Sequence, residues 1–400
     1  MCNITEAANC SGRVAWYFSR ERVAMNRCSR EDTTFAGARR SLVVALGLLA
    51  GCGDWRDGLS HWDGEYVDYY ASSAIEVCGG TPAHVDGFAP FVAAELGLPA
   101  PELLAYSWLR DGGLDEGDFV GAHCGEGEIG CQEGRRAMGN SPLQLSQIVH
   151  AIAELHGVDA QPFLSIGLTR AYDWFGGTVV PSRWVYRLGE IVGSDELRDP
   201  LEELTRTEDA LHFPTAGSFV MFLLSRHGPA PFLEWSRGVG SSRDLERLRD
   251  GFRAAYGVEL DAEAKAYQAG PVCQADAFPI RAYDCVMPEI PWASGDRWSH
   301  TQSLDCASAE VIGGFDPEVA WPSLRSVTIE IPESRTYTMT VTGEGTVAAQ
   351  LGACFGCPWD GRELTIEENG SHTVELAAGT YYLRMKGIAE TPTTLTVTLE

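Results

Sequence analysis

The chain has 400 residues, of which 30 are basic and 56 are acidic, and its formal net charge is −26 at neutral pH. A surface this acidic repels nucleic acid and anionic lipid headgroups, so we expect no nucleic-acid partner. The length is sufficient for a full hydrophobic core and favours two domains over one.

The first distinct element is a short apolar stretch at residues 41–51, which follows Arg39 and Arg40. It is too short to span a bilayer, which takes about 20 apolar residues, whereas its length and basic flank are typical of a secretory signal. The stretch ends in Leu49-Ala50-Gly51-Cys52, which resembles the lipobox of bacterial lipoprotein signals. The resemblance implies that Cys52 is acylated and becomes the first residue of an exported protein, anchored to a bacterial membrane in the periplasm or at the cell surface.

Two other interpretations of this stretch stay open, namely a signal peptide without lipidation and a buried helix of the fold. We favour the lipidated form. Met25 begins a signal of ordinary length, so we expect translation to start there. In either case residues 1–51 form a signal region outside the fold.

Eight cysteines follow Cys52, and an even number in an exported chain predicts disulfides. The sequence does not fix how they pair, because eight cysteines allow about 105 pairings. Cys124 and Cys131 flank a Gly-rich loop, and we predict that they form a local disulfide. Cys354-Phe-Gly-Cys357 has the spacing of a redox pair or a zinc half-site, but no second such motif accompanies it, so we predict a structural role.

The region after the signal predicts a small sheet followed by helices. Residues 65–78 and 103–109 are rich in strand formers, and residues 81–96 between them have apolar side chains at helical spacing. Ser141-Pro142-Leu143-Gln144 predicts a helix start, with Ser141 as the N-cap and Gln144 closing a capping box. Further helices are expected at 162–174, 215–227, 229–238, 242–256 and 260–269.

The end of the chain has a different pattern. Residues 271–310 hold cysteines and prolines without a clear period, and we interpret them as a connector. Beyond about residue 322, short segments alternate at period two, which predicts a β-sandwich over residues 311–400. Ala378-Gly-Thr-Tyr-Tyr382 within it resembles a strand of the prepeptidase C-terminal-type domains appended to secreted bacterial peptidases.

Three segments of the helical region, residues 162–172, 215–228 and 248–257, resemble the gluzincin metallopeptidases of the peptidase MA-like kind. That family binds Zn²⁺ through an HExxH helix, in which two His four residues apart share one face and the Glu activates water. A Glu on the next helix is the third ligand. The resemblance therefore implies an α+β fold, with a mostly helical gluzincin-like domain and a small N-terminal sheet over residues 53–270, followed by the sandwich.

The zinc chemistry of that family is missing at all four positions. Alignment on the family pattern places the two His at Leu143 and Gln147, the catalytic Glu at Gln144 and the third ligand at Ile166. Leu and Ile bind no metal, and Gln144 takes no proton at neutral pH. The resemblance thus predicts a metallopeptidase-like fold with a vacant zinc site, no catalytic residues and no cofactor.

A second polar group lies on the same expected helix. Gln147, His150 and Glu154 form one stripe at helical spacing, which is an alternative position for a metal site. Three functions therefore stay open. They are a non-catalytic lipid-anchored envelope protein that binds a protein, peptide or glycan, a hydrolase with a relocated metal site, and a purely structural envelope protein whose main contact surface is the sandwich. We favour the first.

Overall fold

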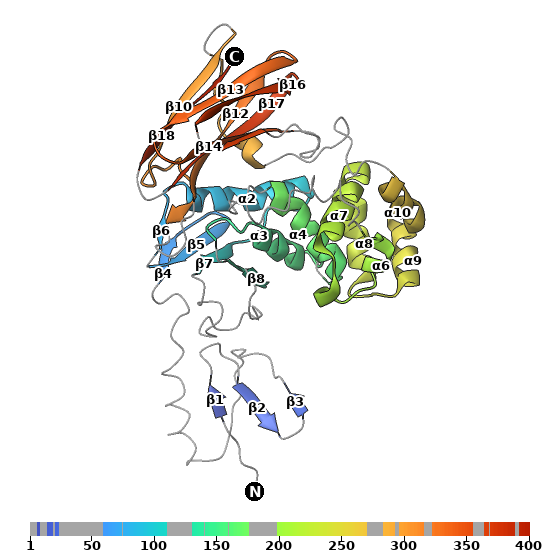
Figure 1. Ribbon diagram of the computed structural model, residues 1–400. Coiled ribbons are helices and arrows are strands. Elements are labelled where there is room, and N and C mark those ends of the chain that lie inside the picture. Colours follow the sequence, from blue (N-terminus) through green and yellow to red (C-terminus); the bar gives the residue numbers. More distant parts are fainter. Residues whose placement is uncertain are drawn as a thin grey trace, which may run out of the picture.

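The computed structural model describes the ranges 6–8, 14–18, 21–23, 59–73, 75–109, 130–139, 141–158, 160–175, 198–269, 283–292, 296–315, 322–354, 364–367, 369–388 and 392–400. These residues form an α+β fold, as the sequence predicts, with a helix-rich part and a β-rich C-terminal part (Figure 1). Near the N-terminus, a small antiparallel sheet has three strands, β1 (Glu6–Ala8), β2 (Val14–Phe18) and β3 (Glu21–Val23).

A mixed five-stranded sheet has the strand order β4-β5-β7-β9-β8. Its strands are β4 (Leu59–Trp62), β5 (Val67–Ser72), β7 (Leu104–Trp108), β8 (Gly130–Glu133) and β9 (Arg136–Gly139). The strands β5, β7 and β9 run parallel, and β4 and β8 are antiparallel edges. Helix α2 (Thr81–Glu95) connects β5 to β7 and covers the sheet with a buried apolar stripe, as its sequence period predicts.

The helical part follows the sheet. It contains α3 (Ser146–Leu155), α4 (Pro162–Phe175), α6 (Pro200–Glu203), the short 3-10 helix η1 (Glu208–Ala210), α7 (Phe213–His227), α8 (Pro229–Val239), α9 (Leu245–Tyr256) and α10 (Leu260–Ala269). The expected helices between residues 162 and 269 are therefore present, with ends shifted by a few residues. One continuous core joins these helices to the sheet and α2.

Helices α4 and α7 pack closely because glycines stand where they meet. A Cβ atom added at Gly167 of α4 would lie 2.3 Å from Val220 Cγ2 and 2.7 Å from the carbonyl oxygen of Ala216, both on α7. Two of the segments that resemble the gluzincins, 162–172 and 215–228, thus lie against each other, and this contact requires a residue without a side chain.

Two antiparallel sheets form the C-terminal sandwich, with strand orders β10-β18-β13-β16 and β12-β17-β14-β15. The strands are β10 (Trp298–Leu304), β12 (Pro322–Ile331), β13 (Arg335–Gly343), β14 (Val347–Ala353), β15 (Leu364–Glu367), β16 (Gly370–Leu376), β17 (Gly379–Ile388) and β18 (Thr393–Leu399). Inward-facing Val, Ile, Leu, Tyr and Met side chains of both sheets fill a separate core. Strand β10 lies within the segment that the sequence assigns to the connector, so the sandwich includes residues before 311.

The sandwich is joined to the rest of the fold by backbone pairing and disulfides. Strand β11 (Gly314–Phe315) pairs with β6 (Glu76–Val77), which immediately precedes α2. Cys78 and Cys306 form a disulfide at this junction. A second disulfide joins Cys285, in the 3-10 helix η3 (Tyr283–Val286), to Cys354 after β14. Cys354 therefore has the structural role that the sequence predicts.

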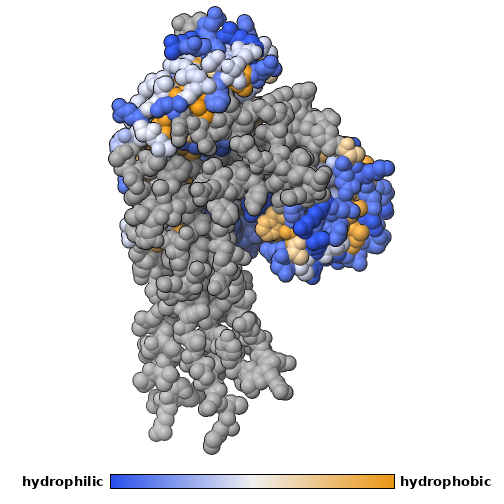
Figure 2. All heavy atoms as spheres, viewed as in Figure 1, coloured by the Kyte–Doolittle hydropathy of each residue, from blue (hydrophilic) through white to orange (hydrophobic). Residues whose placement is uncertain are grey.

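On the face shown in Figure 2, helices α6 to α10 present a mainly hydrophilic surface broken by small apolar patches. Phe213 and Val258 are among the large apolar side chains that stay exposed, at 40% and 38%. A search of the described residues finds no helix with the length and apolar character needed to cross a membrane.

Candidate functional site

The positions that correspond to the HExxH motif begin in a turn that two tyrosines fasten to the sheet. Tyr69 of β5 and Tyr106 of β7 are paired in register, and their rings stack with centroids 5.4 Å apart. The Tyr106 hydroxyl donates to the carbonyl oxygen of Ser141 over 2.6 Å and accepts the amide of Gln144 over 3.0 Å. The Tyr69 hydroxyl donates to the carbonyl oxygen of Pro142 over 3.1 Å.

The Tyr69 hydroxyl remains a donor at any physiological pH. Burial, and to a smaller extent the neighbouring Tyr106, raise the pKa of Tyr69 well above its usual range. Both side chains are fully buried, so their bonds to the turn are shielded from water. The turn at residues 141–145 is consequently held by hydrogen bonds from the sheet below it.

The tyrosine contacts explain why helix α3 begins later than the sequence predicts. The structure starts the helix at Ser146, with Leu145 as an N-cap that makes no side-chain hydrogen bond. The predicted capping box of Ser141 and Gln144 is therefore wrong. Tyr106 takes the Gln144 amide and the Ser141 carbonyl, the backbone groups that a helix starting at Ser141 would use.

The four positions that correspond to the family's zinc site have apolar or amide side chains that do not suit the metal. Leu143 is 1% exposed and belongs to the main core, and Ile166 of α4 packs against the same core while partly buried. Gln144 is 5% exposed, and its Oε1 has no hydrogen-bond partner. Because Leu143 precedes the helix, it does not share a helical face with Gln147. This donor set does not fit zinc.

The alternative stripe on α3 is engaged in a structural contact at one end. The Glu154 carboxylate accepts the backbone amide of Gly134 over 2.9 Å and also a hydrogen bond from the Gln132 side chain, so it holds the turn between β8 and β9. His150 and Gln147 are half-buried on the same helix. Glu154 therefore fixes α3 to the β8–β9 hairpin.

Several site predictions fall outside the described residues. Cys52, the predicted lipidation site, is among them, and so is Cys124. Cys131 is disulfide-bonded, but its pairing with Cys124 stays a prediction. Elsewhere in the described chain, the metal-ligating side chains that converge are His61, Asp63 and Asp68, at the edge of the five-stranded sheet away from β8. This group was not predicted from the sequence, in which the His-x-Asp spacing before the turn is the available signal.

No protein-family model matches the sequence, and no curated protein is similar to it in sequence. Solved structures overlap parts of the fold. The chain is similar over 28% of its length to 97% of PliG, a periplasmic inhibitor of g-type lysozyme from Aeromonas hydrophila, with 12% identity and a TM-score of 0.20. It is similar over 28% of its length to 94% of the pre-peptidase C-terminal domain of a collagenase from Bacillus anthracis, with 14% identity and a TM-score of 0.17.

A longer overlap covers 84% of the chain and 36% of aminopeptidase A from Legionella pneumophila, with 10% identity and a TM-score of 0.32. The chain thus spans about a third of the length of that enzyme. At these TM-scores the overlaps assign no activity to the chain.

Proposed function

We propose that the protein is an exported, lipid-anchored bacterial envelope protein with a metallopeptidase-like fold, which binds or scaffolds another molecule without catalysing its hydrolysis. The observation that carries the non-catalytic part is the burial of Leu143. This residue stands where the gluzincin pattern has a zinc ligand, and it is 1% exposed within the main core. A core leucine supplies dispersion contacts and no electron pair for a metal.

Two long-range disulfides support the exported location. Cys78–Cys306 and Cys285–Cys354 connect segments 228 and 69 residues apart in the sequence. Bonds of this kind persist in oxidising compartments and are rare in the reducing cytosol. A protein that crosses the inner membrane before it folds acquires such bonds in the periplasm or at the cell surface.

Lipidation of Cys52 would hold the domain close to the membrane. Only the segment from Cys52 to Leu59 separates the proposed anchor from strand β4. A segment of this length spans at most roughly 25 Å when fully extended. Because the net charge of −26 opposes attraction to anionic headgroups, acyl chains would supply the membrane affinity.

The position of Glu154 argues against a working site on the polar stripe of α3. Its carboxylate already accepts the amide of Gly134 and a hydrogen bond from Gln132. A metal ligand or a general base here would have to act through Oε1 alone, while Oε2 stays bound to the β8–β9 turn. The binding partner would be a protein, peptide or glycan of the envelope.

The non-catalytic proposal is tested by incubating the detergent-purified full chain with a mixed peptide library, with and without added Zn²⁺. We expect no cleavage above that of a heat-denatured sample. A cleavage that EDTA abolishes, that Zn²⁺ restores and that His150→Ala removes would establish the relocated hydrolase instead. His227→Ala serves as a control, because that histidine lies on α7 beside Glu263 and away from the stripe.

A further inference from the structure

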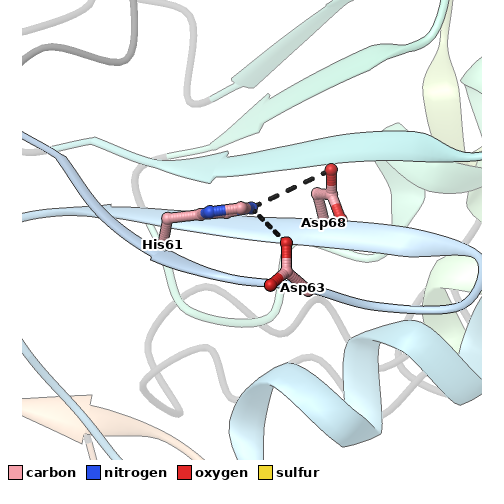
Figure 3. A group of neighbouring side chains, drawn as sticks. All are labelled: His61, Asp63 and Asp68. Carbon is pink, nitrogen blue, oxygen red and sulfur yellow. Dashed lines mark ion pairs between the residues drawn. The ribbon is translucent and has the colours of Figure 1, made fainter.

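The β4–β5 hairpin brings together an imidazole and two carboxylates that no other function uses. His61 lies on β4, Asp63 follows it in the turn, and Asp68 lies on β5. His61 Nε2 is 3.5 Å from Asp63 Oδ1 and 3.9 Å from Asp68 Oδ2, and one ligand atom of each residue lies within 4.8 Å of the other two. Figure 3 shows the three side chains pointing toward one another.

From this geometry we propose that His61, Asp63 and Asp68 bind one divalent transition-metal ion of the zinc class. The separations are longer than the 2.7–3.2 Å of an ordinary hydrogen bond, so the imidazole is not hydrogen-bonded to either carboxylate. Ligands about 2.0–2.2 Å from a tetrahedral zinc ion are about 3.3 Å from one another. The three donors therefore need only a small contraction to reach a shared ion.

The composition of the group selects the class of metal. Imidazole and carboxylate together suit zinc and similar transition metals, whereas Ca²⁺ and Mg²⁺ prefer all-oxygen sites. The acidic surface of the chain also favours a cation over an anion at this hairpin. The expected ligand is thus Zn²⁺ or a close relative.

Contacts outside the group position His61 and the hairpin loop. The His61 ring stacks on the buried ring of Tyr70, with centroids 4.4 Å apart and 9° between the planes. Asp86 of α2 accepts the backbone amides of Tyr66 and Val67 through one carboxylate oxygen, over 2.7 and 2.8 Å, so the hairpin loop is fastened to the helix. Donors positioned by the fold lose little freedom when an ion binds.

The turn between Asp63 and Asp68 is equally constrained. The Gly64 amide donates to Asp68 Oδ1 over 3.2 Å, which leaves Oδ2 directed at His61. A Cβ atom at Gly64 would lie 2.2 Å from the carbonyl oxygen of Val67 and 2.6 Å from Asp86 Oδ1, so only glycine fits this turn. The tight turn keeps Asp63 and Asp68 on the same side as the imidazole.

The site is open to solvent and separate from the vacant zinc position. The Asp63 side chain is 93% exposed and that of His61 37%, so water or an external carboxylate or phosphate would complete the coordination. In the strand order β4-β5-β7-β9-β8, the hairpin lies at the edge opposite the β8–β9 turn that Glu154 holds. The inference therefore goes beyond the proposed function and does not depend on it.

The test is isothermal titration of the EDTA-treated, detergent-solubilised full chain with Zn²⁺ alone. We expect the wild type to bind one equivalent of Zn²⁺. The His61→Gln and Asp68→Asn variants should bind Zn²⁺ with at least tenfold lower affinity. Glu65→Gln is the matched control, because it removes a charge from the same hairpin without removing a donor, and it should bind as the wild type does.

A second titration uses Co²⁺, whose visible absorption reports the donor set. We expect the wild type and Glu65→Gln to give a Co²⁺ absorption spectrum, and His61→Gln to give none. Equimolar Ca²⁺ should not displace the bound Co²⁺. Equal zinc stoichiometry and affinity in the wild type and His61→Gln would overturn the proposal, as would Ca²⁺ displacing Co²⁺ at equimolar concentration. Melting temperatures of all variants without metal show that each is folded, and neither outcome bears on peptide cleavage.

Discussion

Arg384 of β17 and Asp284 of η3 form a buried bidentate ion pair where the sandwich meets the rest of the chain. Arg384 Nε donates to Asp284 Oδ1 over 3.0 Å, and Nη2 donates to Oδ2. The two residues are 8% and 2% exposed. Next to the pair, the Tyr283 hydroxyl donates to the carbonyl oxygen of His84 on α2 over 2.8 Å. Helix η3 thus connects α2 to the sandwich through adjacent residues.

The ion pair should matter most when one partner is removed. Burial alone would raise the pKa of Asp284, but the charge and hydrogen bonds of Arg384 outweigh it, and the pKa lies below the usual range. Arg384→Met leaves a buried carboxylate without its partner and should lower the free energy of unfolding by about 3–5 kcal/mol. Arg297→Met, which removes a surface pair with Glu400, should cost less than about 1 kcal/mol. Urea denaturation of both variants checks this, and equal effects would contradict it.

His84 makes stability depend on pH. Burial lowers its pKa, the charge of Asp284 partly opposes this and that of Arg384 adds to it, so the net pKa is about 4 instead of 6.5. The unfolded chain therefore binds more protons between pH 6.5 and 4, so stability is full above pH 6.5 and is lost as pH falls toward 4. At about 1.36 kcal/mol per pKa unit, the loss is about 3 kcal/mol.

His84→Phe tests this dependence because it keeps the ring that packs 4.7 Å from Tyr283 and removes the titration. Denaturation midpoints measured from pH 7 to 4 should fall less in the variant than in the wild type. Other acidic groups titrate in both proteins, so the difference between them isolates His84. Parallel curves would show that the histidine does not contribute.

Two helical glycines should respond differently to substitution by alanine, because Gly167 lies in the contact between α4 and α7 and Gly238 does not. Gly167→Ala forces a methyl group against Val220 and should destabilise the fold by about 1–3 kcal/mol. Gly238→Ala, on α8, meets nothing within 4 Å and should be neutral or stabilise by up to about 1 kcal/mol. Thermal melts compare the two, and a neutral Gly167→Ala would mean that the helices do not pack this closely.

Removing the hydroxyl group from either tyrosine under the 141–145 turn should lower stability, and the loss should be larger for Tyr106 than for Tyr69. Tyr106→Phe removes both hydrogen bonds to Ser141 and Gln144 and leaves buried backbone groups unpaired, which should cost about 1–3 kcal/mol. Tyr69→Phe removes one longer bond, to Pro142, and should cost less. Hydrogen exchange of the Gln144 amide should accelerate in Tyr106→Phe only. An unchanged exchange rate would argue against the tyrosine contact.

Regular elements could be predicted from the sequence, whereas features set by distant contacts could not. The bounds of helices α2, α7 and α10 lie close to the expected ranges. The start of α3 depends on Tyr106, which lies 35 residues before its partner Ser141, so no local pattern indicates it. Strand β10 was not predicted from the sequence because a buried Gln302, paired with Arg325, interrupts its apolar alternation.

The same limit applies to the cysteines and to the β4–β5 hairpin. Local spacing does not predict the disulfide between Cys78 and Cys306, because the two residues are 228 residues apart. His61 and Asp68 converge only because β4 and β5 pair in a register that brings the hairpin arms together. By contrast, the mismatch of Leu143 and Ile166 with a zinc site is readable from residue identity, and the structure adds that both residues pack against the core.

The central claim is that this chain is exported and anchored through Cys52, and intact mass spectrometry tests it most directly. The full chain is expressed in a bacterial host, extracted from the membrane fraction and measured alongside Cys52→Ser. We predict a wild-type protein that begins at Cys52 and carries the added mass of several acyl chains, and a variant that is neither cleaved before residue 52 nor acylated. A wild-type protein with an unmodified Cys52, or one cleaved at another position without added lipid, would contradict the account.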